Sequence, residues 1–423
     1  MPPPIETVQR FLQNQAAENL DLSGFRLIWT KAYPDKGLRL LYTTKSDSVS
    51  ARPYFFARTM SPQEGQNTVD QMNRYFGPHI ARNGFLRRMG KAALYFSAHN
   101  LLIQIFPADR FLPFLVQAMD PDFMRPAFGA FIRAKGHPRE VVGVQPFVVR
   151  YKPERKCLIQ YRLHWPEADS SHTTQVVYAK IFRKMPQVYD KLQRIYRAAN
   201  GSGFQIPEPL GKIPELCLQL TGNLPGTHLS LLAHRDDFPA ICAQVGKDLL
   251  EFHRTPVLLA DRHDVRSQLE GLQRWGTLLA EALRAHAPRI HRLIEVLSRR
   301  MTGLVSPPAA LVHGDFHVAN ILVDGARLGL LDLEDCGMGN PAIDVGSFHA
   351  QLKLLSLKLH ADHTALDASI EAFLQAYLQG CSPSVATSIP TYSALSALWC
   401  AYFQCVLRPV KKGWYQRALT MIE

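Results

Sequence analysis

The sequence predicts an α+β protein with two lobes, one rich in strands and one mostly helical, and a further α+β segment before them. Residues 144–182 hold three consecutive strand patterns, as in an antiparallel meander. Helical periodicity dominates residues 237–300 and the chain beyond 345. Residues 311–344, between these two helical parts, read as strands and loops. Strands with one helix, followed by helices around a short hairpin, make a two-lobed layout.

The first 140 residues predict a separate α+β domain, in which no catalytic pattern is visible. Helices are expected over residues 1–20 and 62–76. Two hairpins are expected, one in FRLIWTKAYPDKGLRLLYTT with its turn at residues 34–37, and one in AALYFSAHNLLIQIF around Asn100. Residues 107–140 contain five prolines and are expected to form a connector.

The strand-rich lobe is expected to contain one helix after its third strand. Pro186 is a favourable first residue for this helix, and Gly201 is a favourable residue at its end. Two short strands follow in PEPLGKIPELCLQLTG. We therefore divide the chain into an N-terminal domain, residues 1–140, a strand-rich lobe, residues 141–227, and a helical lobe, residues 228–423.

The positive charge of the chain is concentrated in its first 260 residues. The formal net charge is +12, with +7 in residues 1–140, +5 in residues 141–260 and zero in the remainder. Such a field favours anionic partners such as nucleotide phosphates, although a basic surface also serves solubility. Nucleic acid is not indicated, because no binding motif is visible and the charge is not striped along one helix.

The cysteines and the apolar runs point to a protein of the reducing cytoplasm. Seven cysteines are scattered without a CxxC pair, which argues against disulfides and a thiolate zinc site. The N-terminus lacks the basic and apolar regions of a secretory signal. The longest apolar run, residues 395–407, is shorter than the roughly 20 residues that span a bilayer. No membrane partner is therefore expected.

The stretch HGDFH is the first candidate for a functional site. In a strand, His313, Asp315 and His317 would share one face, and two histidines with an aspartate suit zinc. Such a site needs a further ligand, and Gly314 favours a turn over a strand. A metal-dependent hydrolase built on HGDFH is one alternative function.

The residues that follow favour another chemistry. ILVDGARLGLLDLED predicts a hairpin with Asp324-Gly325 as its two-residue turn. In this register Asn320 lies near Gly329, and Asp332 extends past it, beside the loop that carries Asp315. The amide carbonyl of an asparagine and a carboxylate suit Mg²⁺, and a second carboxylate nearby can accept the proton of an attacking hydroxyl. This is the equipment of phosphoryl transfer.

The whole pattern, HxDxxxxN followed by a hairpin, LD and GNPAIDVG, closely resembles the aminoglycoside phosphotransferase and choline kinase family of the protein kinase-like superfamily. The matching elements are LVHGDFHVANIL, LGLLDLEDCGMGNPAIDVG, YAKIF and VGKDLLEFH, and the resemblance covers about residues 143–420. It implies a protein kinase-like fold for the two lobes, with the N-terminal domain as an addition.

The resemblance also implies roles. Asp315 corresponds to the catalytic base, and Asn320 and Asp332 to Mg²⁺ ligands. Lys180 in YAKIF corresponds to the lysine that steadies the α- and β-phosphates of ATP, although a lysine on a strand can also be an ordinary surface residue.

Four further residues complete this set of expectations. His313 is expected to brace the catalytic loop by hydrogen bonds, and Asp344 in GNPAIDVG is expected to anchor that loop and start the next helix. His317 is expected to be a loop side chain near the substrate, and Cys336 a small apolar residue.

Two features depart from protein kinases. The turn YKPERKC has no glycine, so Lys152, Arg155 and Lys156 either offer cationic side chains to the phosphates or form a plain surface turn. In the helix after Lys180 the only acid is Asp190, which is the candidate acidic partner of that lysine.

The sequence therefore predicts an ATP- and Mg²⁺-dependent phosphotransferase that moves the γ-phosphoryl group to a hydroxyl of a small molecule. Aminoglycosides and choline are cationic, and the neutral C-terminal part shows no acidic excess, so a sugar or another neutral or anionic metabolite is favoured. The second alternative is a catalytically inactive kinase-like module for nucleotide sensing or scaffolding. Nothing in the sequence indicates the oligomeric state.

Overall fold

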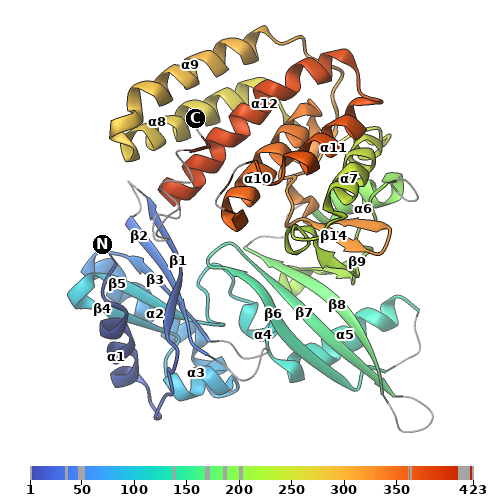
Figure 1. The fold of residues 1–423 in the computed structure, drawn as a ribbon. Coiled ribbons are helices and arrows are strands. Elements are labelled where there is room, and N and C mark those ends of the chain that lie inside the picture. The colour runs from blue at the N-terminus through green and yellow to red at the C-terminus, as the bar shows by residue number, and fades with distance from the viewer. Residues whose placement is uncertain are drawn as a thin grey trace. The chain divides into compact units, whose positions relative to one another are not determined.

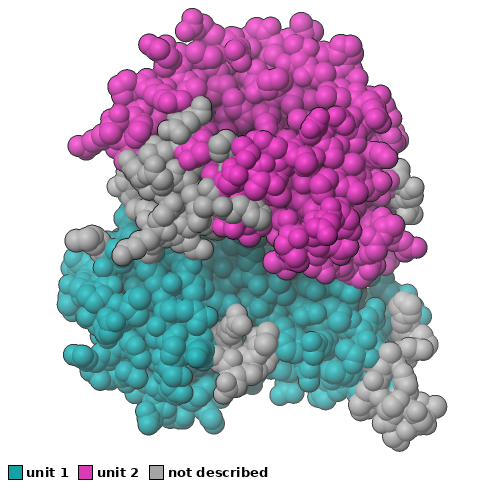
Figure 2. Space-filling model, viewed as in Figure 1, with its two compact units in different colours: residues 1–189, 209–223 teal, residues 190–208, 224–423 magenta. Residues whose placement is uncertain are grey.

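The computed structural model of this 423-residue protein describes residues 2–33, 37–45, 53–136, 140–166, 172–183, 188–199, 203–360, 362, 364–407 and 420–421. The chain forms two compact units, which Figure 2 shows in different colours. Unit 1 consists of residues 1–189 and 209–223, and unit 2 of residues 190–208 and 224–423. Each unit buries its own hydrophobic core.

Unit 1 begins with an antiparallel sheet of strand order β1-β2-β3-β5-β4, on which α2 packs (Figure 1). Its elements are α1 (Ile5–Gln15), β1 (Arg26–Tyr33), β2 (Gly37–Thr43), β3 (Tyr54–Thr59), α2 (Pro62–Ile80), α3 (Gly84–Met89), β4 (Ala93–Phe96) and β5 (Leu101–Ile105). The hydroxyl of Ser61 caps α2 by accepting the Glu64 N–H, and Pro62 follows it, as at many helix starts. Both predicted hairpins and both predicted helices are confirmed; residues 34–36 of the first turn lie outside the described residues.

The second sheet of unit 1 has the strand order β6-β7-β8-β10-β9 and carries helix α5 on one face (Figure 1). Its elements and neighbours are α4 (Leu115–Ala118), α5 (Pro121–Ala134), β6 (Gly143–Lys152), β7 (Lys156–Pro166), β8 (His172–Phe182), β9 (Pro209–Ile213) and β10 (Leu218–Gly222). The face toward α5 is apolar: the Tyr161 hydroxyl donates to the Ala118 carbonyl at 2.6 Å, and its ring lies 4.9 Å from the ring of Phe128. The predicted meander is confirmed.

Helix α6 (Val188–Ala199) follows the meander, as the sequence predicts. Its buried side chains Leu192 and Ile195 belong to the core of unit 2. The predicted first residue Pro186 and the predicted end at Gly201 lie outside the described residues.

Unit 2 is mostly helical (Figure 1). Its remaining long helices are α7 (Phe238–His253), α8 (Val265–Ala282), α9 (Ala287–Gly303), α10 (Ala342–His360), α11 (Asp367–Leu378) and α12 (Pro383–Tyr402). Helices α10 and α12 approach closely because Gly346 has no side chain: a Cβ at this position would lie 2.5 Å from the Tyr392 carbonyl carbon. The last residue of the predicted GNPAIDVG element thus has a packing role.

Two small sheets lie within this helical unit. One joins β11 (Thr227–His228), β14 (Ile321–Asp324) and β15 (Arg327–Leu330), and the other joins β12 (Arg262–His263), β16 (Gly337–Gly339) and β13 (Ala310–Val312). The β14–β15 hairpin is confirmed, but its predicted turn is wrong by one residue. Gly325 and Ala326 form the two-residue turn, and Gly325 has a φ of +59°. Glycine at the first central position is the signature of a type II′ turn, which keeps Asp324 in the strand.

The α+β architecture that the sequence predicts is confirmed: unit 1 carries the two five-stranded sheets, and unit 2 is mostly helical. Among the helices in the described part of the chain, none is long and apolar enough to cross a membrane. All seven cysteines carry free thiols, and Cys336 is fully buried.

Candidate active site

The HGDFH stretch forms a loop directly after β13, and His313 lies fully buried at its start. Nδ1 of His313 accepts the Asp315 N–H at 3.3 Å, and Nε2 donates to the Leu331 carbonyl at 2.9 Å. Both ring nitrogens are used inside the protein, so neither is left to bind a metal. Contrary to the metal-site interpretation of HGDFH, His313 is a hydrogen-bonded part of the loop.

Asp344, fully buried in the first turn of α10, holds the same loop. Its Oδ2 accepts the His313 N–H at 2.6 Å, and its Oδ1 accepts the Gly314 N–H at 2.9 Å. Nε2 of His253 lies 3.1 Å from Oδ2, and Nδ1 of His253 lies 2.8 Å from the Tyr377 hydroxyl. Burial raises the pKa of Asp344, but the hydrogen bond and charge of His253, with His313, lower it below its usual value.

Gly314 is required by the space around the loop. It has a φ of +79°, and a Cβ there would lie 2.6 Å from the Asp335 carbonyl oxygen and 2.7 Å from the His263 ring. The backbone conformation alone disfavours a side chain, and the close neighbours add to this. The expected turn at this glycine is therefore present.

Asp315, the predicted base, has a side chain that is 52% exposed, and His317 lies against it. Nε2 of His317 is 3.6 Å from Oδ2 of Asp315, while Nδ1 accepts the Ala319 N–H at 3.2 Å. Because Nδ1 is an acceptor, the ring proton is on Nε2 and faces the carboxylate. Partial burial raises the pKa of Asp315, but His317 and His313 outweigh this, and the pKa lies below its usual value. His317 is thus a partner of Asp315, a contact that the sequence did not predict.

Asn320 is buried, and its amide group spans the loop: Nδ2 donates to the Asp315 carbonyl at 2.9 Å. The amide carbonyl is then the atom of this side chain that can bind a cation. The Leu331 N–H donates to the backbone carbonyl of Asn320 at 2.8 Å, so Asn320 lies beside Leu331 and not, as predicted, beside Gly329. This register brings the next residue, Asp332, toward the loop of Asp315.

Asp332 follows β15 with a φ of +62°, a conformation that is uncommon for a residue with a side chain. Its negative charge raises the pKa of Asp315, which places the two carboxylates in one electrostatic environment. An amide carbonyl and a carboxylate are hard oxygen donors that fit Mg²⁺, with water and phosphate oxygens as the other ligands. Within the described residues no group of three or more His, Cys, Asp or Glu could hold a metal by itself.

Lys191 on α6 is a residue of this region that sequence analysis missed. Its Nζ donates to the Asp261 carboxylate at 2.8 Å, to the Cys336 carbonyl at 3.0 Å and to the Glu334 carbonyl. The side chain is 12% exposed. Asp190, the neighbouring residue and the predicted partner of Lys180, is exposed in the first turn of α6. The pairing of Asp190 with Lys180 stays a prediction.

Lys180 lies on β8, between Leu158 of β7 and Gln219 of β10, and is half-buried. Its neighbours Ala179 and Ile181 belong to the core on the α5 side, so by strand alternation Lys180 is on the other face. Gln219 is 4% exposed, and its Oε1 has no hydrogen-bond partner. The sequence did not indicate that the polar side chain of Gln219 would be buried in the sheet.

Arg155 and Lys156 lie at the turn that joins β6 to β7, where the Arg155 N–H donates to the Lys152 carbonyl at 3.1 Å. Arg155 is exposed, and Lys152 and Lys156 are half-buried. Glu154, between them, is buried with a φ of +60°. The cations of this turn were predicted from the sequence as candidate phosphate contacts, but no role was predicted for Glu154.

The sequence profile of the phosphotransferase enzyme family (APH) matches residues 171–389, about half of the chain. The chain belongs to this family. The resemblance carried by HGDFHVAN and GNPAIDVG is thereby confirmed, and with it the protein kinase-like fold of the phosphotransferase. The match contains Lys180, Asp190 and all predicted site residues of unit 2; Arg155 and Lys156 precede it.

Solved structures of several kinases resemble this phosphotransferase at low sequence identity. A choline/ethanolamine kinase family protein from Mesorhizobium loti is 18% identical, with 62% of this chain and 85% of that chain covered and a TM-score of 0.42. Amicoumacin kinase, in complex with AMP-PNP, Ca²⁺ and Ami, is 16% identical, with 65% and 86% covered and a TM-score of 0.47. A glucosamine kinase is 16% identical, with 62% and 90% covered and a TM-score of 0.41. No curated protein matches the sequence.

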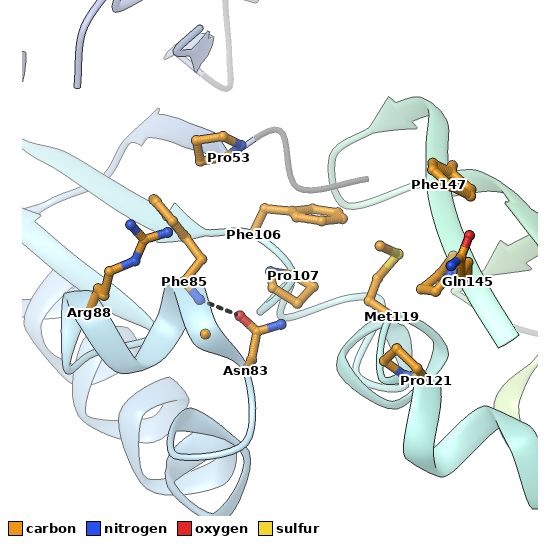
Figure 3. Close-up of a pocket in the computed structure, with 12 residues that line it drawn as sticks. Pro53, Asn83, Phe85, Arg88, Phe106, Pro107, Met119, Pro121, Gln145 and Phe147 are labelled. Atoms are coloured by element: carbon orange, nitrogen blue, oxygen red, sulfur yellow. Dashed lines mark hydrogen bonds between the residues drawn. The ribbon is translucent and has the colours of Figure 1, made fainter. Parts of the chain in front are cut away.

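Unit 1 of the phosphotransferase also holds a cavity of about 470 Å³, between α3, the segment after β5 and the start of β6 (Figure 3). Its wall is mainly apolar, with Phe85, Phe106, Met119 and Phe147 among its residues. The polar Asn83 in this wall is occupied as the cap of α3, where its Oδ1 accepts the Phe85 N–H at 3.2 Å. None of the predicted site residues lines this cavity, so phosphoryl transfer is not assigned to it.

Proposed function

We propose that this phosphotransferase is an ATP- and Mg²⁺-dependent kinase that moves the γ-phosphoryl group to a hydroxyl of a small molecule. The observation that carries the proposal is the loop and hairpin on which Asp315, Asn320 and Asp332 occur together. Asp315 keeps a lowered pKa there, and Asn320 is fixed by its hydrogen bond to the Asp315 carbonyl at 2.9 Å. Such transfer depends mainly on positioning and on charge neutralisation.

Asp315 is the proposed base. Its lowered pKa keeps the carboxylate ionised at neutral pH, and its partial exposure leaves it within reach of an acceptor. It accepts the proton of the acceptor hydroxyl as the new oxygen–phosphorus bond forms and the bond from the γ-phosphorus to the bridging oxygen breaks. ADP takes up the bonding electrons and leaves.

The carbonyl oxygen of Asn320 and the carboxylate of Asp332 are the proposed Mg²⁺ ligands. When bound, Mg²⁺ neutralises charge on the phosphate oxygens. The protein's part is to hold both oxygens: the amide of Asn320 through the Asp315 carbonyl, and the chain after Asp332 through Lys191.

Lys180, and with it Arg155 and Lys156, are the proposed contacts to the nucleotide phosphates. The excess of positive charge in residues 141–260, +5, supports an anionic ligand for this part of the chain. Asp190 remains the proposed acidic partner of Lys180.

For the acceptor, a neutral or anionic hydroxyl compound such as a sugar or phosphorylated metabolite is proposed. Residues 261–423 have a net charge of zero, which gives no excess of acids for a cationic aminoglycoside or choline. We further propose a cytoplasmic location, in line with seven free thiols.

The test is ATP turnover by the purified protein. Mg²⁺-dependent ATP hydrolysis should fall by about 10²-fold or more in Asp315→Ala, because the base is lost, and also in Asp332→Ala, because the metal ligand is lost. Asp324→Asn is the matched control: it changes an exposed aspartate in the turn region of the same hairpin. Its activity should equal that of the wild type.

Two outcomes decide against the proposal. If ATP with Mg²⁺ does not raise the melting temperature of the protein, the protein does not bind ATP and the kinase function is rejected. If ATP binds but no member of a broad panel of sugars, phosphorylated metabolites, aminoglycosides and amino alcohols is phosphorylated, the nucleotide-sensing module is favoured instead.

A further inference from the structure

The turn between β6 and β7 has an acid at a position that disfavours it. The Arg155 N–H bonds the Lys152 carbonyl, so residues 152–155 form a β-turn with Pro153 second and Glu154 third. A φ of +60° at the third position is typical of a type II turn, where glycine or asparagine is preferred. A glutamate keeps such a conformation only when its surroundings hold it.

The N-terminal domain supplies these surroundings to the side chain of Glu154, which is 3% exposed. Nη1 of Arg58 on β3 donates to Oε2 at 2.9 Å, and Nε of Arg110 donates to Oε1 at 2.9 Å. Nε2 of Gln104 on β5 donates to Oε1 at 3.1 Å, and Nη2 of Arg39 on β2 lies 3.9 Å from Oε2. One carboxylate thus faces three guanidinium groups of the N-terminal sheet and the segment after it.

Asp109 holds the backbone of the same turn. It is fully buried, and its Oδ2 accepts the Glu154 N–H at 2.7 Å and the Tyr151 O–H at 2.7 Å. Its Oδ1 accepts the N–H groups of Phe111 and Leu112. The N-terminal domain therefore binds Glu154 through both its backbone N–H and its side-chain carboxylate.

Cationic side chains lie around the turn that these interactions hold. With Glu154 drawn into the domain, the next residue, Arg155, is exposed. The guanidinium carbon of Arg110 lies 4.4 Å from the ring centre of Phe111, and that of Arg183, directly after β8, lies 3.9 Å from the same centre. The N-terminal domain thus adds its own arginine and an aromatic platform beside the end of β8.

We infer that the N-terminal domain positions the β6–β7 turn for the nucleotide, with Glu154 as the residue it holds. The inference rests on the proposed kinase function. A buried ion cluster costs desolvation and contributes geometry more than net stability, which suits an element that must hold cations in place for phosphates. Glu154 itself is a positioning residue: it keeps Arg155 and its neighbours in register with the phosphates and touches no nucleotide.

The test compares ATP affinity with turnover in the full-length protein. Glu154→Gln keeps the size of the side chain and removes the charge that three arginines hold. The KM for ATP in Mg²⁺-dependent hydrolysis should rise about tenfold while kcat changes by less than about twofold, and the Kd of a fluorescent ATP analogue should rise by the same factor. Arg58→Gln removes the partner on the domain side and should give the same result, which serves as the readout if Glu154→Gln lowers the melting temperature.

Two further variants sharpen the test. Glu18→Gln changes an exposed glutamate of the same domain and should leave both constants unchanged. Glu154→Gly relieves the backbone conformation but removes the carboxylate, so its ATP affinity should also fall.

The inference and the function fail in different ways. Wild-type ATP affinity in Glu154→Gln and Arg58→Gln, or in Glu154→Gly, would overturn the positioning role and leave the kinase function standing. Absence of nucleotide binding in the wild type would overturn both.

Discussion

Nζ of Lys191 lies 3.0 Å from the backbone carbonyl oxygen of Cys336, and the same ammonium group bonds the Glu334 carbonyl and the Asp261 carboxylate. Three acceptors satisfy its three N–H donors. Helix α6 is thereby joined to the segment that follows Asp332, the proposed Mg²⁺ ligand. A lysine outside every recognised motif thus holds the segment that follows that ligand.

Replacing this lysine should affect both stability and the use of metal. In Lys191→Met the carbonyls of residues 334 and 336 lose their donor, so the free energy of unfolding should fall by about 1–3 kcal/mol. The Mg²⁺ concentration for half-maximal ATP hydrolysis should rise, because the support of Asp332 is weakened. The measurements are urea unfolding and a Mg²⁺ titration, with Lys247→Met on the exposed side of α7 as the control. An unchanged Mg²⁺ titration in Lys191→Met would separate α6 from the metal site.

Two glycines with positive φ should respond differently to alanine. At Gly325 nothing lies within 4 Å of an added Cβ, so Gly325→Ala carries the backbone cost alone, about 1 kcal/mol. At Gly314 the Cβ would meet the Asp335 carbonyl oxygen at 2.6 Å, so Gly314→Ala should lower the free energy of unfolding by about 3 kcal/mol or more. Chemical denaturation of both variants gives the comparison. Equal losses would mean that the loop relaxes around the new methyl group.

Asp344 should make the stability of the protein depend on acid pH. Its folded-state pKa lies below the unfolded value of about 3.9, so its stabilisation is present above that value and is lost as the pH falls through the folded pKa. Asp344→Asn should lower the free energy of unfolding by about 3 kcal/mol at neutral pH, and this difference from the wild type should shrink in acid. Urea unfolding from about pH 7 down to about pH 3 measures it. A difference that is the same at every pH would contradict the ionised state of Asp344.

His317 should set the acid limit of activity. It lowers the pKa of Asp315, so His317→Ala should raise that pKa and move the acid limb of the pH profile for ATP hydrolysis toward higher pH. At about pH 8 the activity should fall by less than about tenfold, since Asp315 stays ionised there. His291→Ala, at an exposed position on α9, is the control and should keep the wild-type profile. An acid limb that does not move would contradict this role of His317.

The parts of the fold and site that could be predicted carry their signal locally. Asp315 and Asn320 are five residues apart, and the hairpin that follows them is indicated by Gly325 in its turn. The predicted turn was wrong by one residue, and the strand pairing by two, because the sequence does not say which pair around Gly325 forms the turn. The positive φ of Gly325 at the first central position decides it in favour of Gly325 and Ala326.

The contacts that could not be predicted join residues far apart in the chain. Lys191 bonds the Cys336 carbonyl, 145 residues away. Every residue has a backbone carbonyl, so the sequence does not indicate which one accepts this bond. Glu154 meets Arg58 and Arg110 across 96 and 44 residues, in a domain without a recognised motif. Such partners emerge only when the sheets of unit 1 are assembled.

One carboxylate, that of Asp344, accepts the amide protons of both His313 and Gly314, 31 and 30 residues earlier in the chain. These amides can exchange with solvent only when the loop, the first turn of α10 and His253 at the end of α7 come apart together. We therefore expect the amides of His313 and Gly314 to exchange slowly with solvent. If this loop carries the proposed transfer, the motions that admit substrate and release product are expected to arise in other segments.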